Sequence, residues 1–155
     1  MARSELAEKA FARIRETVTD QVEVIEEEDL LRIEPVTSGG FAVQIHDDVR
    51  ELTIAAGGWH SHSSDLDEIC DCAMWLFTPF YRIVQTKRSG QVVKARLERF
   101  EPPGQWEVME KLGILFGWFG RKTTTVLQQN VFEVPQEFLA RFPTGAIGSD
   151  GFPLS

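Results

Sequence analysis

A segment of alternating residues followed by a short turn constrains the fold of this chain most strongly. In residues 41–46, Phe41, Val43 and Ile45 occupy every second position, which is the period-two pattern of a half-buried strand. The turn sequence Asp47-Asp48 follows, and then the apolar segment 51–56. Strands joined by so short a connection pair antiparallel. We therefore expect a β-hairpin over residues 41–56.

Other strand patterns lie on both sides of this hairpin. They cover residues 22–25, 30–33, 81–87, 91–100 and 121–131. Turn sequences such as Ser38-Gly39-Gly40 and Ser89-Gly90 separate several of them. Short turns between successive strands again favour antiparallel pairing.

Apolar residues three or four positions apart predict two main helices. Residues 3–19 carry such a stripe opposite a charged face, and residues 64–78 carry another. The second helix has a clear start signal, because either Ser64 or Asp65 can cap it with an acidic residue three positions later. Strands that run in groups, rather than in strict alternation with helices, favour the α+β class.

The sequence thus predicts an α+β fold, with a mainly antiparallel sheet of six or seven strands and the two helices on one face. The 155 residues correspond to one domain. We place this domain at residues 1–143. Residues 144–155, which include three glycines, are expected to form a mobile tail.

Charge and composition narrow the class of protein. The formal net charge of −8 argues against nucleic acid as a partner, because phosphate binding needs a basic surface. No apolar run approaches the roughly 18 residues of a membrane-spanning helix, and the N-terminal segment lacks the apolar region of a secretory signal. Two cysteines, Cys70 and Cys72, provide no disulfide framework, which fits a reducing compartment. We therefore expect a cytoplasmic protein with neither a membrane nor a nucleic-acid partner.

The candidate site is Trp59-His60-Ser61-His62, which follows an apolar strand and two glycines. It contains two of the three histidines in the chain. Imidazoles two positions apart on an extended segment project to the same side and can hold zinc together with a third protein ligand. Asp65 or Glu68 is the candidate for that third ligand.

Residues 58–62 resemble the His-x-His motif of the zinc-dependent deubiquitinase-like (JAMM) metalloproteases, which have His-Ser-His at a strand end. The resemblance implies a zinc-dependent hydrolase centred on His60 and His62. That family also has a serine eight residues after the second histidine and a ligand aspartate three residues later. These positions are Cys70 and Ala73 here, so the likeness fails at a metal ligand. The segment also resembles a Trp-His-x-His strand end of small uncharacterised bacterial α+β proteins, which implies no activity.

An architectural role is the other interpretation of the candidate site. If the strand runs straight through Gly57-Gly58, both histidines share the face of Ile54 and Trp59 points to the other side. A bulge at the glycines would reverse this facing. In the straight arrangement, His60 and His62 lie at the edge of the core, where hydrogen bonds can satisfy partly buried imidazoles.

We therefore expect a small soluble binding or protein-interaction domain without catalytic machinery, with Trp59, His60 and His62 as candidate ligand-binding residues. No metal or other cofactor is expected. The alternative is a zinc-dependent hydrolase on the histidine pair. The expected partner is a second copy of the chain or another protein, and the uncharged segment 114–120 is expected to be a buried strand or a contact with such a copy.

Overall fold

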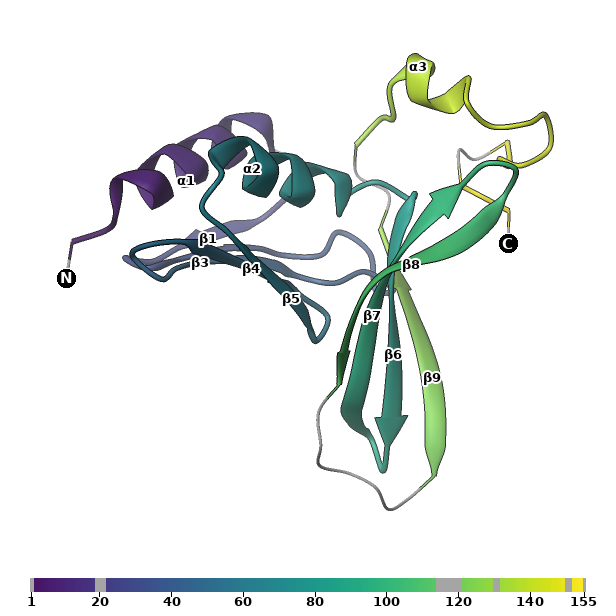
Figure 1. Cartoon of the computed structure of the whole chain (residues 1–155), viewed down its shortest axis with the longest axis horizontal. Coiled ribbons are helices and arrows are strands. Elements are labelled where there is room, and N and C mark those ends of the chain that lie inside the picture. Colours follow the sequence, from purple (N-terminus) through teal and green to yellow (C-terminus); the bar gives the residue numbers. More distant parts are fainter. Residues whose placement is uncertain (1, 19–21, 114–120, 130–131, 150–151, 155) are drawn as a thin grey trace.

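The computed structural model describes the whole chain except residues 1, 19–21, 114–120, 130–131, 150–151 and 155. The described part contains three helices and nine strands, which form two antiparallel sheets (Figure 1). The predicted α+β class and the antiparallel pairing are confirmed. The prediction for segment 114–120 concerns residues outside the described ranges, and the mobility of residues 144–155 stays a prediction.

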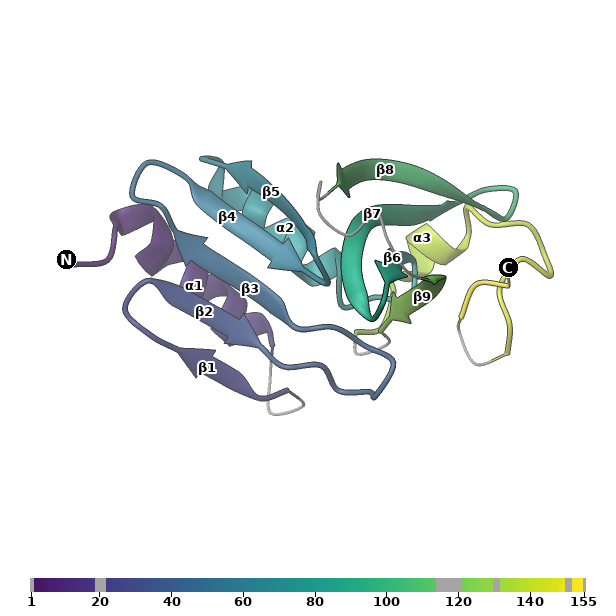
Figure 2. The same cartoon turned by 90° about the horizontal axis from the view of Figure 1, so that it is seen from below.

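The first sheet is covered by helices on one face only. Its strands, in spatial order and each antiparallel to the next, are β1 (Val24–Glu26), β2 (Leu30–Ile33), β3 (Val43–Asp47), β4 (Leu52–Ala56) and β5 (Trp59–Ser63). Helices α1 (Glu5–Thr17) and α2 (Leu66–Trp75) lie side by side on one face, as predicted (Figures 1 and 2). Figure 2 looks onto the opposite face, which no described helix covers. We call this the open face.

The hydrophobic core lies between these two helices and the first sheet. Phe11 and Ile14 of α1 and Ile69 of α2 are almost completely buried, as the predicted helical stripes require. On the sheet side of the core, every second residue of β3 and β4 is buried, and Ile45 and Ile54 are among them. Burial of one such side chain contributes about 1.5–3 kcal/mol relative to its exposure. The face of the first sheet that packs against the helices is therefore the apolar one.

The second sheet explains why the strands outnumber the prediction. It has the order β8-β7-β6-β9 and contains β6 (Tyr81–Arg88), β7 (Gln91–Glu101), β8 (Gln105–Gly113) and β9 (Lys122–Gln128). Helix α2 interrupts the series of hairpins after β5, so the later strands pair among themselves instead of extending the first sheet. A short helix α3 (Gln136–Leu139) lies beside the start of the second sheet, where the ring centroid of Phe138 is 4.9 Å from that of Phe80, the residue directly before β6.

Specific contacts join the two sheets. Gln85 Nε2 of β6 donates to the carbonyl oxygen of Gly57 at 2.7 Å. Gln128 N of β9 donates to the carbonyl oxygen of Gly39 at 3.0 Å. The first bond holds β6 beside the β4–β5 turn, and the second holds the end of β9 beside the connection between β2 and β3. No helix in the described part of the chain is long and apolar enough to cross a membrane.

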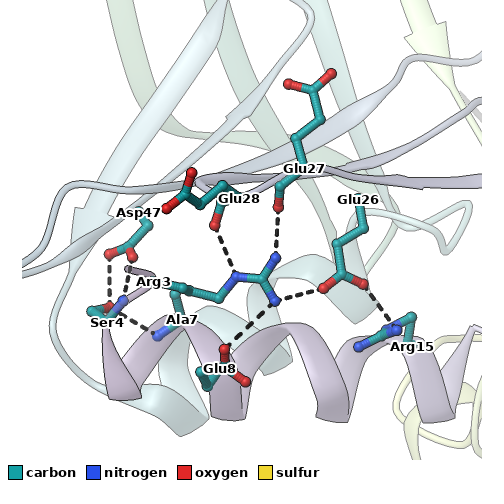
Figure 3. A network of polar contacts seen from close by, with 9 residues as sticks. All are labelled: Arg3, Ser4, Ala7, Glu8, Arg15, Glu26, Glu27, Glu28 and Asp47. Carbon is teal, nitrogen blue, oxygen red and sulfur yellow. Dashed lines mark hydrogen bonds and ion pairs between the residues drawn. The ribbon is translucent and has the colours of Figure 1, made fainter. Parts of the chain in front are cut away.

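A polar network fixes the start of α1 to the first sheet (Figure 3). Ser4 Oγ accepts from Ala7 N at 3.1 Å, which caps the helix, and donates to Asp47 Oδ1 at 2.7 Å. Ser4 N donates to the other oxygen of Asp47 at 2.7 Å. Arg3 donates to the carboxylate of Glu26 at 2.6 Å and to two carbonyl groups of the turn after β1. The helix is thus attached to both β3 and the β1–β2 turn.

These contacts change the acidity of Asp47. Burial by itself raises the pKa of this carboxyl. The hydrogen bonds from Ser4 and Val49 and the positive charge of Arg3 outweigh the burial, so the pKa of Asp47 lies below its ordinary value. The charged form is therefore the one that the folded structure stabilises.

The substitution Asp47→Asn tests this contribution. Because the pKa of Asp47 is lower in the folded than in the unfolded chain, its stabilisation is complete above about pH 4 and is lost as the pH falls through the lowered value. At neutral pH the variant should lose about 1 kcal/mol of unfolding free energy. Urea denaturation at a series of pH values should show this difference shrink in acid. The matched control Asp29→Asn, at an exposed position, should change stability by less than about 0.5 kcal/mol. A difference for Asp47→Asn that persists unchanged in acid would contradict the role given to the charge.

Candidate functional site

A two-residue turn, and not a continuous strand, precedes the candidate site. Gly57 and Gly58 have φ angles of 56° and 89° and connect β4 to β5, so that Ala56 pairs directly with Trp59. A hairpin turn with positive φ at both positions matches the twist of the flanking strands, and glycine adopts it without steric cost. The interpretation of a straight strand through the glycines is therefore wrong.

This turn decides which side chains reach the open face. Trp59 is 2% exposed and belongs to the hydrophobic core, on the same face of the sheet as Ile54. His60 pairs with Ala55, and His62 pairs with Thr53, both on the open face. The facing is the reverse of that expected for a straight strand, and the histidines do not lie at the edge of the core.

His62 is bound by neighbours in its own hairpin. Its Nδ1 lies 2.7 Å from Thr53 Oγ1, and the Thr53 hydroxyl donates to the carboxylate of Asp48. Because the hydroxyl has a single hydrogen, His62 Nδ1 is the donor to Thr53. Glu51 Oε1 lies 3.7 Å from the same nitrogen. The ring centroids of His60 and His62 are 5.3 Å apart, so the pair is adjacent, as the sequence predicts.

The proposed third zinc ligands lie elsewhere. Asp65 is the N-cap of α2, where Oδ1 accepts from the N–H groups of Asp67 at 2.9 Å and Glu68 at 3.2 Å. The carboxylate of Glu68 accepts from Ser63 Oγ at 3.0 Å. Both acids belong to the helix that covers the opposite face of the first sheet. No group of three or more His, Cys, Asp and Glu side chains among the described residues could hold a metal ion.

A groove of about 430 Å³ occupies the open face where β5 approaches the second sheet. Arg32, Gln44, Ala55 and His60 line it from the first sheet, and Leu127 of β9 lines it from the second. Phe41, the β4–β5 turn and Trp59 complete the lining. The structure thus places Trp59 and His60 at a concave surface, with the Trp59 side chain in the core, while His62 is not part of the lining.

Strand register aligns the polar residues of this groove. Arg32 pairs with Gln44, Gln44 with Ala55, and Ala55 with His60. Since neighbouring strands lie about 4.8 Å apart, the row from β2 to β5 spans about 14 Å. Ala55, the smallest side chain in the row, leaves room above the middle of the sheet.

Neighbouring side chains orient the donors in this row. Arg32 Nε donates to Glu34 Oε1 at 2.5 Å, and this hydrogen bond raises the pKa of Arg32. Gln44 Oε1 lies 3.1 Å from His46 Nε2, so the Gln44 carbonyl is used as an acceptor and its amide nitrogen is left as a donor. Within the described part of the chain, neither this nitrogen nor the terminal guanidinium nitrogens of Arg32 have another hydrogen-bond partner.

The charge of the groove differs from that of the chain. The sequence has 24 acidic and 16 basic residues, yet no aspartate or glutamate is among the described residues that line the groove. Hydrogen-bond donors predominate on its floor. Among the described residues that line it, Arg32 carries a full charge and is already paired with Glu34, so the arrangement favours a ligand that supplies hydrogen-bond acceptors.

Arg32 and Gln44 are the site residues that the sequence reasoning missed. A signal was present, because each is a polar residue at an outward position between two apolar residues of a strand. Their proximity to His60 could not be read from the sequence, since it depends on the register of three successive hairpins. No family model matches this chain, and neither does any curated protein or solved structure.

The turn can be tested by adding one methyl group. Gly57→Ala should lower the unfolding free energy by about 1–3 kcal/mol, because L-residues rarely adopt its positive φ. The new Cβ would also lie 3.1 Å from Ile83 Cγ2. Gly39→Ala is the matched control, since its Cβ would have no neighbour within 4 Å and its φ is not positive; it should change stability by less than about 0.5 kcal/mol. Equal effects of both changes in chemical denaturation would contradict the assigned turn.

The zinc alternative makes a separate prediction. A catalytic zinc ion needs three protein ligands and an open fourth position. We therefore expect elemental analysis of protein purified without a metal-affinity tag to find no stoichiometric zinc. Near-equimolar zinc that disappears in His60→Ala would overturn this expectation and support the hydrolase alternative.

Proposed function

We propose that this chain is a binding domain without catalytic machinery, and that its ligand is a small organic acid with an apolar portion. The observation that carries the proposal is the donor-lined groove on the open face. Its volume of about 430 Å³ falls in the usual range of small-molecule sites, about 300–1,000 Å³.

The carboxylate of such a ligand matches the polar row. Arg32 supplies a guanidinium already oriented by Glu34, and Gln44 supplies an amide N–H group. His60, at the other end of the row, supplies a ring nitrogen. Hydrogen bonds to charged groups contribute about 1.5–3 kcal/mol each, so they can outweigh the general repulsion of an anion by an acidic protein.

The apolar portion of the ligand matches the wall of the groove. Phe41 and Leu127 line that wall, and Gly57 brings the backbone close to Leu127. Burial of each additional CH₂ group contributes about 0.8 kcal/mol, so affinity should rise with the length of the apolar chain until the groove is filled.

The same lining supports binding better than hydrolysis. No serine, cysteine, aspartate or glutamate is among the described residues that line the groove, and His60 is its one imidazole. A hydrolase needs a nucleophile or an activated water next to a base. The cytoplasmic location is part of the proposal, and the two free cysteines, Cys70 and Cys72, support a reducing compartment.

Calorimetric titration with butyrate, hexanoate and octanoate tests the proposal. Affinity should increase along the series, and hexanamide, the neutral analogue of hexanoate, should bind at least about 10-fold more weakly because it lacks the charge. Arg32→Gln should weaken hexanoate binding by about 10-fold or more, and Ala55→Leu should abolish it by filling the groove.

The matched control is Arg50→Gln, which removes the same charge from an exposed position outside the groove. It should leave hexanoate affinity unchanged. The proposal would be wrong if hexanamide bound as well as hexanoate, or if Arg32→Gln and Arg50→Gln had equal effects.

A further inference from the structure

Strand β9 forms a long edge of the second sheet. It lies beside β6 at the end of the sheet (Figure 1). The two strands pair over seven residues of β9, from Lys122 to Gln128, without a shift of register. Gly39 is the described residue that bonds to its other side, at Gln128. Lys122, Thr123, Thr124 and Val126 are exposed. The first half of this edge therefore faces solvent.

Two backbone hydrogen bonds show which groups point outward. Arg121 O accepts from Ser89 N, on the side of β6, at 3.4 Å. Gln128 N donates to Gly39 and so points away from β6. Because backbone groups alternate along a strand, the odd-numbered residues bond to β6, and Lys122, Thr124 and Val126 direct their N–H and C=O groups outward.

This edge has few of the features that usually prevent strand pairing. Exposed edges are commonly very short, charged, bulged or covered. Among the other sheet edges, β1 has three residues, β5 contacts β7 and β8, and β8 has charged Glu107 exposed on it. In β9 the one charged residue, Lys122, stands at the end, and the uncharged, β-branched run Thr123-Thr124-Thr125-Val126 follows it. Such a run favours pairing with another strand.

We propose that β9 pairs antiparallel with β9 of a second copy of this chain, about a two-fold axis at Thr124. In this register Thr124 faces its own copy, Thr123 faces Thr125, and Lys122 faces Val126. The outward groups of Lys122, Thr124 and Val126 then form hydrogen-bonded pairs across the axis. Gly39 occupies the outward side of Gln128, which is why the axis lies at Thr124 and not nearer the end of the strand.

The residues of β9 favour β9 of a second copy of the chain as the strand that pairs with this edge. No charge meets a like charge in this register, and β-branched residues meet each other, which stabilises cross-strand pairs. The same surface patch is used by both copies, as a two-fold interface requires. Five paired residues bury less area than a standard interface, so the dimer should be concentration-dependent. The inference does not depend on the ligand of the groove.

Sedimentation velocity of the full chain is the first test. Between about 1 µM and about 1 mM the protein should pass from monomer to dimer, the range expected for an interface below standard size. Thr124→Pro should abolish the dimer without changing the melting temperature, because the lost N–H faces solvent in the monomer. Thr124→Val, which keeps the N–H, should dimerise like the parent.

A charge exchange tests the register and does not depend on proline being tolerated. Thr124→Lys and Thr124→Glu each place like charges opposite one another at the axis, so each variant alone should be monomeric. Their equimolar mixture should form a heterodimer. A parent chain that stays monomeric over the whole range would overturn the proposal. So would variants that dimerise like the parent, or a mixture that stays monomeric.

Discussion

The positive φ angles of Gly57 and Gly58 are the constraint on which the candidate site depends. They close the β4–β5 hairpin in two residues and place Trp59 opposite Ala56. Because side chains alternate along a strand, burial of Trp59 sends His60 to the open face. A shift of one residue would move His60 into the core and Trp59 into the groove. The turn also accepts a hydrogen bond from Gln85, and a Cβ at Gly57 would lie 3.1 Å from Ile83 Cγ2, so the second sheet approaches the turn closely.

The position of His60 matters because helices cover only the other face of the first sheet. Helices α1 and α2 cover one face of the first sheet, and the Ser4–Asp47 contact fixes the first of them at its start. The uncovered face is where Arg32, Gln44 and His60 align across the strands. Glu34 accepts a hydrogen bond from Arg32, and His46 is bonded to the side-chain oxygen of Gln44. The side-chain groups that Arg32 and Gln44 have left are donors. The donor groups of this row thus result from local pairing on an acidic protein.

Local signals predicted much of the fold. The alternation in residues 41–46 predicted β3. The acidic start signal predicted a cap at either Ser64 or Asp65, and Asp65 is the residue that caps α2. Contacts between distant residues had no such signal. Ser4 and Asp47 are 43 positions apart, and nothing in either neighbourhood indicates the other. The two sheets were predicted as one, because strand patterns specify how a strand faces but not which strands become neighbours. The same limit applies to the groove: Trp59 and His60 are adjacent in the sequence and could be named together from it, whereas Arg32 lies beside them only through strand register.

Isotope-edited NOE spectroscopy tests the central claim most directly, because it measures which side chains share a face. We predict contacts between the His60 ring and the Ala55 methyl group, and between the Trp59 ring and the Ala56 methyl group, as the β4–β5 register requires. Contacts of the His60 ring with core residues such as Ile54, together with a Trp59 ring that has no contact to the core, would show that the strand faces the other way. That result would contradict the assigned turn, and with it the groove.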